Sequence, residues 1–482
     1  MKFNGSQVSQ RLLIPFIACL LFSLLGGIPA RAQEQASPTP EMQQMEKKME
    51  QLENEILELK KQMSTGARPA KPAPDVTEEE VSIPELDVVS PSGQAGEPPE
   101  KSPSRTSVDF YGYVMLDAGN NFKAIDPNWF DVMRPTKLPA FAGQFGPNGN
   151  VFFGVRQTRF GVKTLTPTSL GNLKTIFEYE LFGTGVDAGQ TTFRLRHAYG
   201  ELGHFGAGQT WSAFMDIDVF PNSLEYWGPN GMVFFRNVQF RWIPIVKGDS
   251  NVVVALERPG FSGDGGVYSQ KIELQNVNPQ LKWPDLTGHA RLSRKWGYVQ
   301  VGGIVRKIAW VDYAGNTSPY NFSGSAVGWG VNVSSNLKVT KKDVAKLSVV
   351  YGEGIENYMN DAPIDIGAQH NPSNAISPVK GVPLPVLGVV AFLDHNWSDK
   401  FSTSTGYSIV NIDNSNAQLP SDYHQGHYAL TNLLYHPVKS VTMGGEFQFG
   451  RRVNFSDGFN VNDYKLQFSF RYDWSKGFSF GY

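Results

Sequence analysis

The sequence predicts an all-β fold: a transmembrane antiparallel β-barrel of sixteen strands over residues 108–482, preceded by an N-terminal helical coiled coil. Apolar and polar residues alternate in stretches of about ten, the length that a tilted membrane strand needs. The connections between these stretches are alternately short and long. The chain is rich in glycine (49) and phenylalanine (32), yet its mean hydropathy is only −0.29. A barrel produces this average because lipid-facing and lumen-facing residues cancel.

Residues 1–32 are predicted to be a signal peptide. Lys2 and Arg11 supply the basic region, residues 12–28 the apolar region, and Ala30-Arg31-Ala32 the cleavage signal. A transmembrane anchor is the alternative, but the apolar run is short and a cleavage site follows it. The only cysteine, Cys19, lies in this segment. The mature chain therefore has no disulfide, thiolate metal site or cysteine nucleophile.

Residues 33–63 are predicted to form a periplasmic coiled coil. Both signs of charge flank the apolar seam, as in Lys48 and Glu53, which favours a parallel oligomer over a single helix lying on a membrane. Ile56 at an a position with leucines at d favours a dimer in isolation, so two or three strands remain open. The seam follows an unbroken heptad register: Met42, Met45, Met49, Leu52, Ile56, Leu59 and Met63.

Residues 64–107 hold many prolines and an acidic run at 78–80, so they have little to bury. We interpret them as a disordered, semi-extended linker in the periplasm. After it, sixteen candidate strands follow. They are 108–118, 151–164, 171–183, 190–201, 204–212, 231–243, 250–258, 286–295, 297–311, 323–337, 343–353, 385–396, 399–412, 424–437, 439–453 and 463–474.

The connections test this assignment independently. Those after even-numbered strands are short, and most of those after odd-numbered strands are long, with 184–189 as an exception. Short periplasmic turns and long extracellular loops are typical of outer-membrane barrels, and an even strand count puts both termini in the periplasm. Residues 475–482 either extend the last strand or follow a turn.

Candidate pore residues come from the parity of the strands. In 190–201, Phe193, Leu195, His197 and Tyr199 form the apolar set, which is expected to face lipid and to turn Arg194 and Arg196 inward. A lipid-facing arginine near the midplane costs about 2–4 kcal/mol. The alternative is that the arginines are held in salt bridges with Glu178, Glu180 or Glu201 and only stiffen the wall.

Two other strands carry arginine. Arg241 faces the lumen by the same argument. Arg156 and Arg159 have opposite parity, so one of them faces inward and the other needs a bulge or a rim position. Parity alone does not say which.

The connection 213–230 is predicted to fold into the pore as a constriction loop, the alternative being an ordinary surface loop. Its acidic residues, facing a basic wall, would create a transverse field at the constriction. The candidate residues are Asp216, Asp218, Phe220 and Glu225.

Neither composition nor motifs indicate an enzyme. There is no HExxH, GxSxG or P-loop motif, and the histidines share no metal-ligand spacing, so we expect no catalytic residue, metal or cofactor. The short Gly-Asp stretch 262–266 is a weak match to a calcium loop and fits a flexible loop better. Lys and Arg (43) nearly balance Asp and Glu (45), so any charge selectivity must come from placement. We expect no nucleic-acid partner.

Residues 194–201 (RLRHAYGE) and 208–216 (GQTWSAFMD) together resemble the DcaP-like porins. So do 156–161 (RQTRFG), 351–355 (YGEGI) and the coiled coil before the barrel. The resemblance implies a homotrimer of sixteen-stranded barrels in a bacterial outer membrane, taking up small anionic solutes such as dicarboxylates. It also implies anion binding by Arg194 and Arg196, with Arg156 or Arg159 and Arg241, opposite Asp216 and Asp218.

Outer-membrane lipid and lipopolysaccharide would then be partners of the barrel, and peptidoglycan would be a contact of the coiled coil. The alternative function is a trimeric outer-membrane anchor or adhesin with a plugged barrel, linked to the cell wall through residues 33–63. A cation or sugar channel is a further transport alternative, which a line of lumen-facing aromatic residues would favour.

Overall fold

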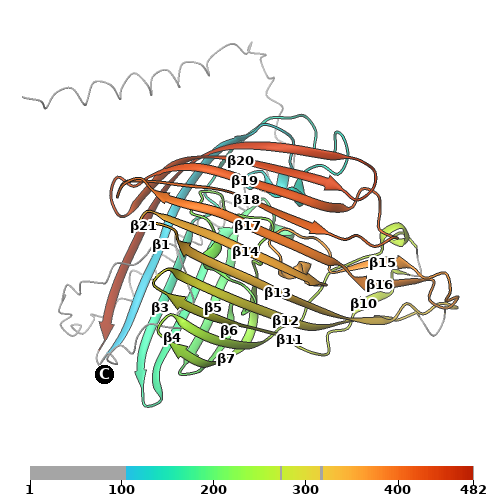
Figure 1. Cartoon of the computed structure of the whole chain (residues 1–482), viewed down its shortest axis with the longest axis horizontal. Helices are drawn as coiled ribbons and strands as arrows, with labels where there is room; N and C mark the ends of the chain where they lie inside the picture. Colours follow the sequence, from blue (N-terminus) through green and yellow to red (C-terminus); the bar gives the residue numbers. More distant parts are fainter. Residues whose placement is uncertain (1–104, 272–273, 315–317, 481–482) are drawn as a thin grey trace, which may run out of the picture. The chain divides into compact units, whose positions relative to one another are not determined.

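The structure is a computed structural model that describes residues 105–480, except 272–273 and 315–317. In this part of the chain sixteen long strands form one barrel (Figure 1). They are β1 (Thr106–Asn121), β3 (Arg159–Thr168), β4 (Gly171–Phe182), β5 (Thr191–Leu202), β6 (Phe205–Trp211), β7 (Arg236–Lys247), β8 (Ser250–Glu257), β11 (Asp285–Arg294), β12 (Gly297–Asp312), β13 (Gly324–Lys338), β14 (Asp343–Glu353), β17 (Pro385–Asn396), β18 (Phe401–Ile412), β19 (Tyr423–Tyr435), β20 (Val441–Asn454) and β21 (Asn460–Phe480).

Shorter strands complete the sheet. β2 (Asn150–Gly154) and β3 both pair with β1, so they are two pieces of one interrupted strand. β10 (Val277–Pro279) extends β11 in the same way along β12. A separate small sheet joins β9 (Gly263–Asp264), β15 (Ile366–His370) and β16 (Val379–Pro383), which come from two long loops.

The first and last strands close the barrel. β1 and β21, blue and red in Figure 1, pair antiparallel from Thr106 opposite Phe480 to Asn121 opposite Lys465. Closure satisfies the backbone groups that an open sheet edge would leave unpaired in lipid. The register also answers the question about the chain's end, because residues 475–480 continue β21. Both ends of the described barrel therefore lie at the same rim.

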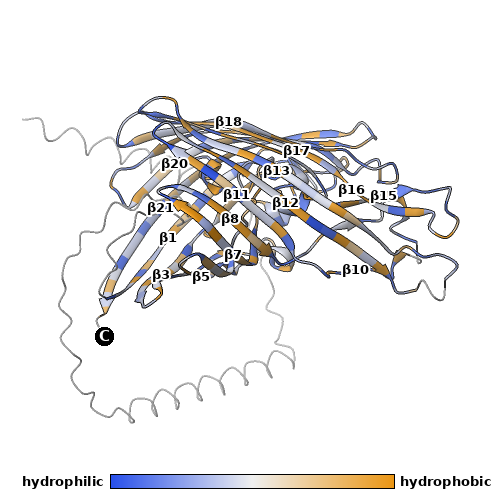
Figure 2. Cartoon of the chain, turned by 60° about the horizontal axis from the view of Figure 1, so that its bottom comes forward, coloured by the Kyte–Doolittle hydropathy of each residue, from blue (hydrophilic) through white to orange (hydrophobic). Residues whose placement is uncertain are grey.

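Apolar and polar residues alternate along the strands (Figure 2). The exposed fractions show that this alternation separates an apolar outer face from a polar interior. In β13, Val331 and Val333 are 43% and 45% exposed, whereas Asn332 and Ser334 are 2% and 1% exposed. The exposed set is apolar and the buried set polar, the reverse of a soluble protein and the pattern of a barrel in lipid. The last strand shows the same pattern: Phe468 and Phe470 are exposed, and Gln467 is fully buried.

The predicted parity of the connections is confirmed as well. Turns such as 203–204 and 248–249 are two residues long, with Gly203 and Gly248 at positive φ, which a tight hairpin requires. The long connections, including 122–149, 212–235 and 354–384, all begin and end at the other rim. No helix among the described residues is long and apolar enough to cross a lipid bilayer. The predicted signal peptide, coiled coil and almost all of the linker lie outside the described residues.

The prediction of a strand over 231–243 was wrong at its start, because β7 begins only at Arg236. Residues 212–235, here called the inserted loop, instead fold into the barrel. The backbone N–H of Gly231 donates to the Ser408 hydroxyl of β18, on a distant part of the wall (2.9 Å). Polar groups on the wall thus form hydrogen bonds with the loop's backbone. Residues 231–235 are apolar because they are buried inside the barrel, and this pattern resembled a strand.

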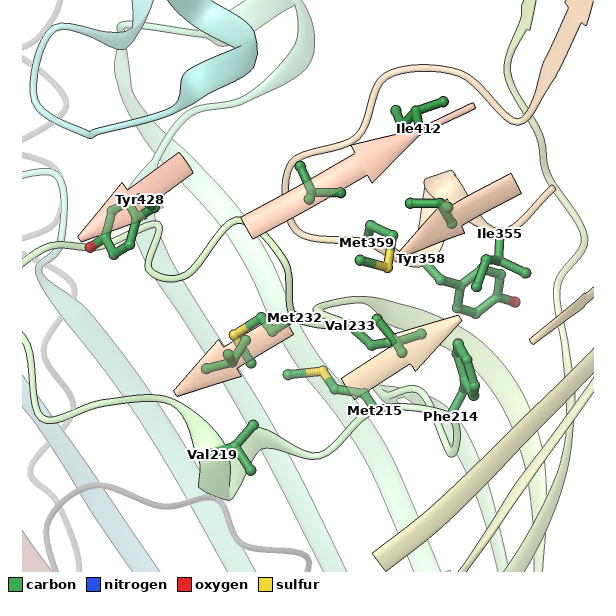
Figure 3. Packing of buried hydrophobic residues seen from close by; sticks show 14 of the residues in the cluster. Phe214, Met215, Val219, Met232, Val233, Ile355, Tyr358, Met359, Ile412 and Tyr428 are labelled. Atoms are coloured by element: carbon green, nitrogen blue, oxygen red, sulfur yellow. The ribbon is translucent and has the colours of Figure 1, made fainter. Parts of the chain in front are cut away.

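A hydrophobic cluster holds the inserted loop in place. Figure 3 shows Met215 and Met232 of this loop near Tyr358 and Met359 of the loop 354–384. Val233 and Met359 form a β-bridge that ties the two loops together. The apolar core of the molecule therefore lies inside the barrel, between loops and wall, and leaves polar side chains to line the remaining space.

Candidate functional site

Four arginines converge on one carboxylate of the inner wall. Arg196 Nη1 lies 2.6 Å and Arg159 Nη2 3.3 Å from Glu180 Oε2. Arg194 Nη1 and Arg236 Nη2 each lie 3.7 Å from Glu180 Oε1. We call Arg159, Arg194, Arg196 and Arg236 the arginine cluster.

A second carboxylate completes the cluster. Glu178 Oε1 lies 2.6 Å from Arg196 Nε and 3.8 Å from Arg159 Nε, and Tyr111 donates a hydrogen bond to Oε2 (2.8 Å). Four guanidinium groups thus face two carboxylates, which leaves two positive charges in excess. The carboxylates hold the arginines in place without neutralising them, so the predicted salt bridges and a positive wall are both present.

A β-bulge in β5 determines which way the side chains of Arg196 and His197 point. The pairing of β4 with β5 shifts register between Glu178 and Tyr179, where His197 and Leu195 are the partners. The extra residue on β5 places Arg196 and His197 on the same side, and both are buried. The prediction that His197 and Tyr199 face lipid was therefore wrong, because it assumed unbroken alternation.

The interruption between β2 and β3 resolves the opposite parity of Arg156 and Arg159. Thr158 N donates to the carbonyl of Val155, so a turn separates the two strand pieces and lets both arginines face inward. Arg156 is 1% exposed and is bound by Asp131 (2.6 Å) and by the carbonyl of Gly183 (2.9 Å). Arg156 therefore stabilises the loop 122–149 through Asp131, whereas Arg159 belongs to the arginine cluster.

The acidic residues of the inserted loop face a different arginine. Arg291 of β11 lies 2.7 Å from Asp216 Oδ1 and 2.5 Å from Asp218 Oδ2. Tyr298 donates to Asp216 as well (2.8 Å). The expectation that Asp216 and Asp218 stand opposite Arg194 and Arg196 was wrong, because the loop reaches β11–β13 before it turns back across the lumen.

Glu225 and Phe220 fix the inserted loop rather than face open space. The buried carboxylate of Glu225 accepts hydrogen bonds from Met133 N (3.0 Å), from Gly228 N and from Tyr428 OH (3.3 Å). Burial raises the pKa of Glu225 to about 7. Phe220 packs against Phe234, with ring centroids 5.8 Å apart.

Two cavities lie on either side of the arginine cluster. The larger, of about 300 Å³, is lined by Arg134, Arg194, Tyr226, Trp227 and Glu356, among others. The smaller, of about 110 Å³, lies nearer the short turns, and its lining includes Tyr199, Arg241, Arg291, Lys163 and Lys174. Arg241 is held by Gln239 Oε1 (3.1 Å) and the carbonyl of Trp211 (2.6 Å). Along β5, the larger cavity therefore comes first, the arginine cluster second and the smaller cavity third.

Comparisons with known proteins identify the family of this chain. The sequence model of the DcaP outer membrane protein family matches residues 94–473. The chain belongs to the DcaP family. A search of curated proteins found no match. The predicted resemblance to DcaP-like porins is confirmed.

The fold of this DcaP-family chain is shared by a solved outer-membrane channel. It is similar to the outer membrane channel DcaP of Acinetobacter baumannii, with a TM-score of 0.62 and 19% identity over 78% of this chain and 99% of that one. An anion-selective porin from Comamonas acidovorans gives a TM-score of 0.49 and 9% identity over 77% and 100%. OmpT of Vibrio cholerae gives 0.45 and 14% over 78% and 99%. Family and fold are those of porin-type outer-membrane channels rather than of enzymes.

Sequence reasoning missed several inward arginines of this DcaP-family barrel, among them Arg236 and Arg291. Arg291 alternates with the apolar residues Ala290 and Leu292, so the parity argument applied to the other strands would have found it. Arg236 has the parity of the outward residue Val238, yet its side chain is only 5% exposed. It stands at the first position of β7, where the chain leaves the inserted loop, and alternation carries no information there.

Proposed function

We propose that the protein is a passive porin for small anionic solutes such as dicarboxylates, with the arginine cluster as its selective constriction. The observation that carries the proposal is the excess of positive charge, since four arginines meet only two carboxylates at one level of the lumen. Rings of arginine favour anions in pores because they replace the hydration that the anion loses.

The basic side chains also form a path. Arg194 lines the larger cavity, and Lys163, Lys174 and Arg241 line the smaller one beyond the cluster. An anion that leaves one basic group thus meets another within a few residues along the wall. Conduction needs several such sites, each strong enough to admit the ion and weak enough to release it.

Three further features are part of the proposal. We infer a homotrimer from the resemblance to the DcaP-like porins, embedded among outer-membrane lipid and lipopolysaccharide. Residues 33–63 would gather as a coiled coil in the periplasm, close enough to peptidoglycan for contact. These features concern assembly, and the proposed anion preference does not depend on them.

Single-channel recording of the mature protein in a planar bilayer tests the function. Under a salt gradient we expect an anion-selective reversal potential, conductance in three equal steps, and block by a small dicarboxylate. A cation-selective channel that ignores the dicarboxylate would contradict the arginine constriction. A protein that inserts but never conducts would instead favour the anchor or adhesin function.

A further inference from the structure

An unpartnered carboxyl group lines the larger cavity. Glu356 opens the short 3-10 helix Glu356–Tyr358 in the loop 354–384 and is 0% exposed. Within the described residues, neither of its carboxylate oxygens has a hydrogen-bond partner. A buried polar group without a partner costs free energy, so its persistence at a cavity wall indicates a group that a ligand completes.

The nearby cation, Arg306, already forms ion pairs with two other carboxylates. Arg306 pairs with Asp285 (3.2 Å) and Asp365 (3.3 Å) and donates to the carbonyl of Gly354 (3.1 Å). Burial and the neighbouring carboxylate of Asp365 raise the pKa of Glu356 well above its usual value. A positive charge in the cavity would reverse this shift, because it stabilises the ionised carboxylate.

The lining of the cavity also includes a positively charged group. Arg194 contacts Tyr226 OH (3.3 Å) and Glu180 (3.7 Å) through Nη1, and its side chain is 30% exposed. Its guanidinium therefore keeps donors directed at open space. Phe234 and Phe235 line the same cavity, and Phe234 N donates to the carbonyl of Tyr358 (2.9 Å), two residues from Glu356 in the chain. Aromatic faces next to a carboxylate suit an ammonium group.

We propose that the larger cavity is a subsite for small zwitterionic solutes of amino-acid type, with the solute's carboxylate on Arg194 and its ammonium group on Glu356. The inference deepens the proposed function and rests on it, since it names a solute class for the same pore. A volume of about 300 Å³ is at the lower end for ligand pockets and suits a molecule of amino-acid size.

A simple dicarboxylate fits this cavity less well. One of its carboxylates can pair with Arg194, but the other would then face Glu356 and could meet it only as a neutral carboxyl group. An ammonium group instead lets Glu356 ionise and form an ion pair. An amino dicarboxylate carries the missing ammonium group on the same carbon skeleton. Glutamate and glutarate are therefore a matched pair of probes that differ by that one group.

The test is block of single-channel current by each probe at neutral pH. We expect glutamate to block at about tenfold lower concentration than glutarate, the order expected for one added hydrogen bond between charged groups. Net charge alone predicts the opposite order for an anion channel, because glutarate carries the larger negative charge. Glu356→Gln should abolish the glutamate preference.

The matched control is Glu353→Gln at the end of β14, which is not among the residues lining the cavity. It should keep the glutamate preference. Equal block by both probes in an anion-selective wild-type channel would overturn the zwitterion subsite alone. A wild-type channel without anion selectivity would overturn the proposed function instead. A preference that survives Glu356→Gln would also refute the assignment of Glu356.

Discussion

Replacing Arg194 by glutamine tests the arginine cluster with little damage to the fold. Arg194 is the most exposed member of the cluster, and its contact with Glu180 is long (3.7 Å). Arg196 continues to hold Glu180 at 2.6 Å in the variant. Arg194→Gln therefore leaves three guanidinium groups against two carboxylates and halves the excess charge.

The size of the effect follows from Coulomb's law. For an ion about 6 Å from the lost charge, the interaction is about 0.7 kcal/mol in bulk water and about 3 kcal/mol at an effective dielectric constant near 20. The loss disfavours anions and favours cations, so both changes lower the permeability ratio. Screening at about 0.1 M salt roughly halves the effect. The anion-to-cation permeability ratio should therefore fall at least about threefold.

The reversal potential in a tenfold KCl gradient measures this ratio directly. Arg294→Gln removes the same charge from an exposed position at the end of β11 and serves as the control, with no expected change. If Arg194→Gln and Arg294→Gln give the wild-type reversal potential alike, the cluster does not set selectivity and the electrostatic reasoning is refuted.

Two further predictions concern stability. Arg196→Gln removes a buried guanidinium group from Glu178 and Glu180, which should lower the free energy of unfolding by about 3–5 kcal/mol. The denaturation midpoint in detergent should therefore fall far more than it does for Arg194→Gln. Equal midpoints for the two variants would contradict this. Burial raises the pKa of Glu225 from 4.5 to about 7, so the folded state holds its proton more tightly and stability should fall as pH rises from about 4.5 to 7. Glu225→Gln should flatten that part of the stability curve, and an unchanged slope would show that Glu225 does not titrate in this range.

Much of the barrel could be predicted because its rules are local. A lipid-facing side and a polar lumen impose period two on every strand, and the alternation of turns and loops gives a second, independent count. All sixteen strands were therefore found to within a few residues at most ends. The start of β7 was wrong by five residues, because residues 231–235 are apolar for a different reason: they pack inside the barrel.

The site was harder to predict, since it depends on breaks in those rules. The bulge that turns Arg196 and His197 inward together leaves no mark in the sequence pattern. The course of the inserted loop depends on partners far away in the chain, such as Arg291 for Asp216. Parity predicted that Arg194 and Arg196 face the lumen, but it could not say which carboxylate each of them meets.

The most direct test of the central claim is an anomalous-diffraction map of crystals soaked in bromide. The account predicts a bromide peak within hydrogen-bonding distance of Arg194 or Arg236, the two members of the cluster with the longest contacts to Glu180. Bromide sites elsewhere in the lumen with none at the cluster would mean that Glu178 and Glu180 fully satisfy the arginines. The proposed constriction would then be a structural brace and not an anion site.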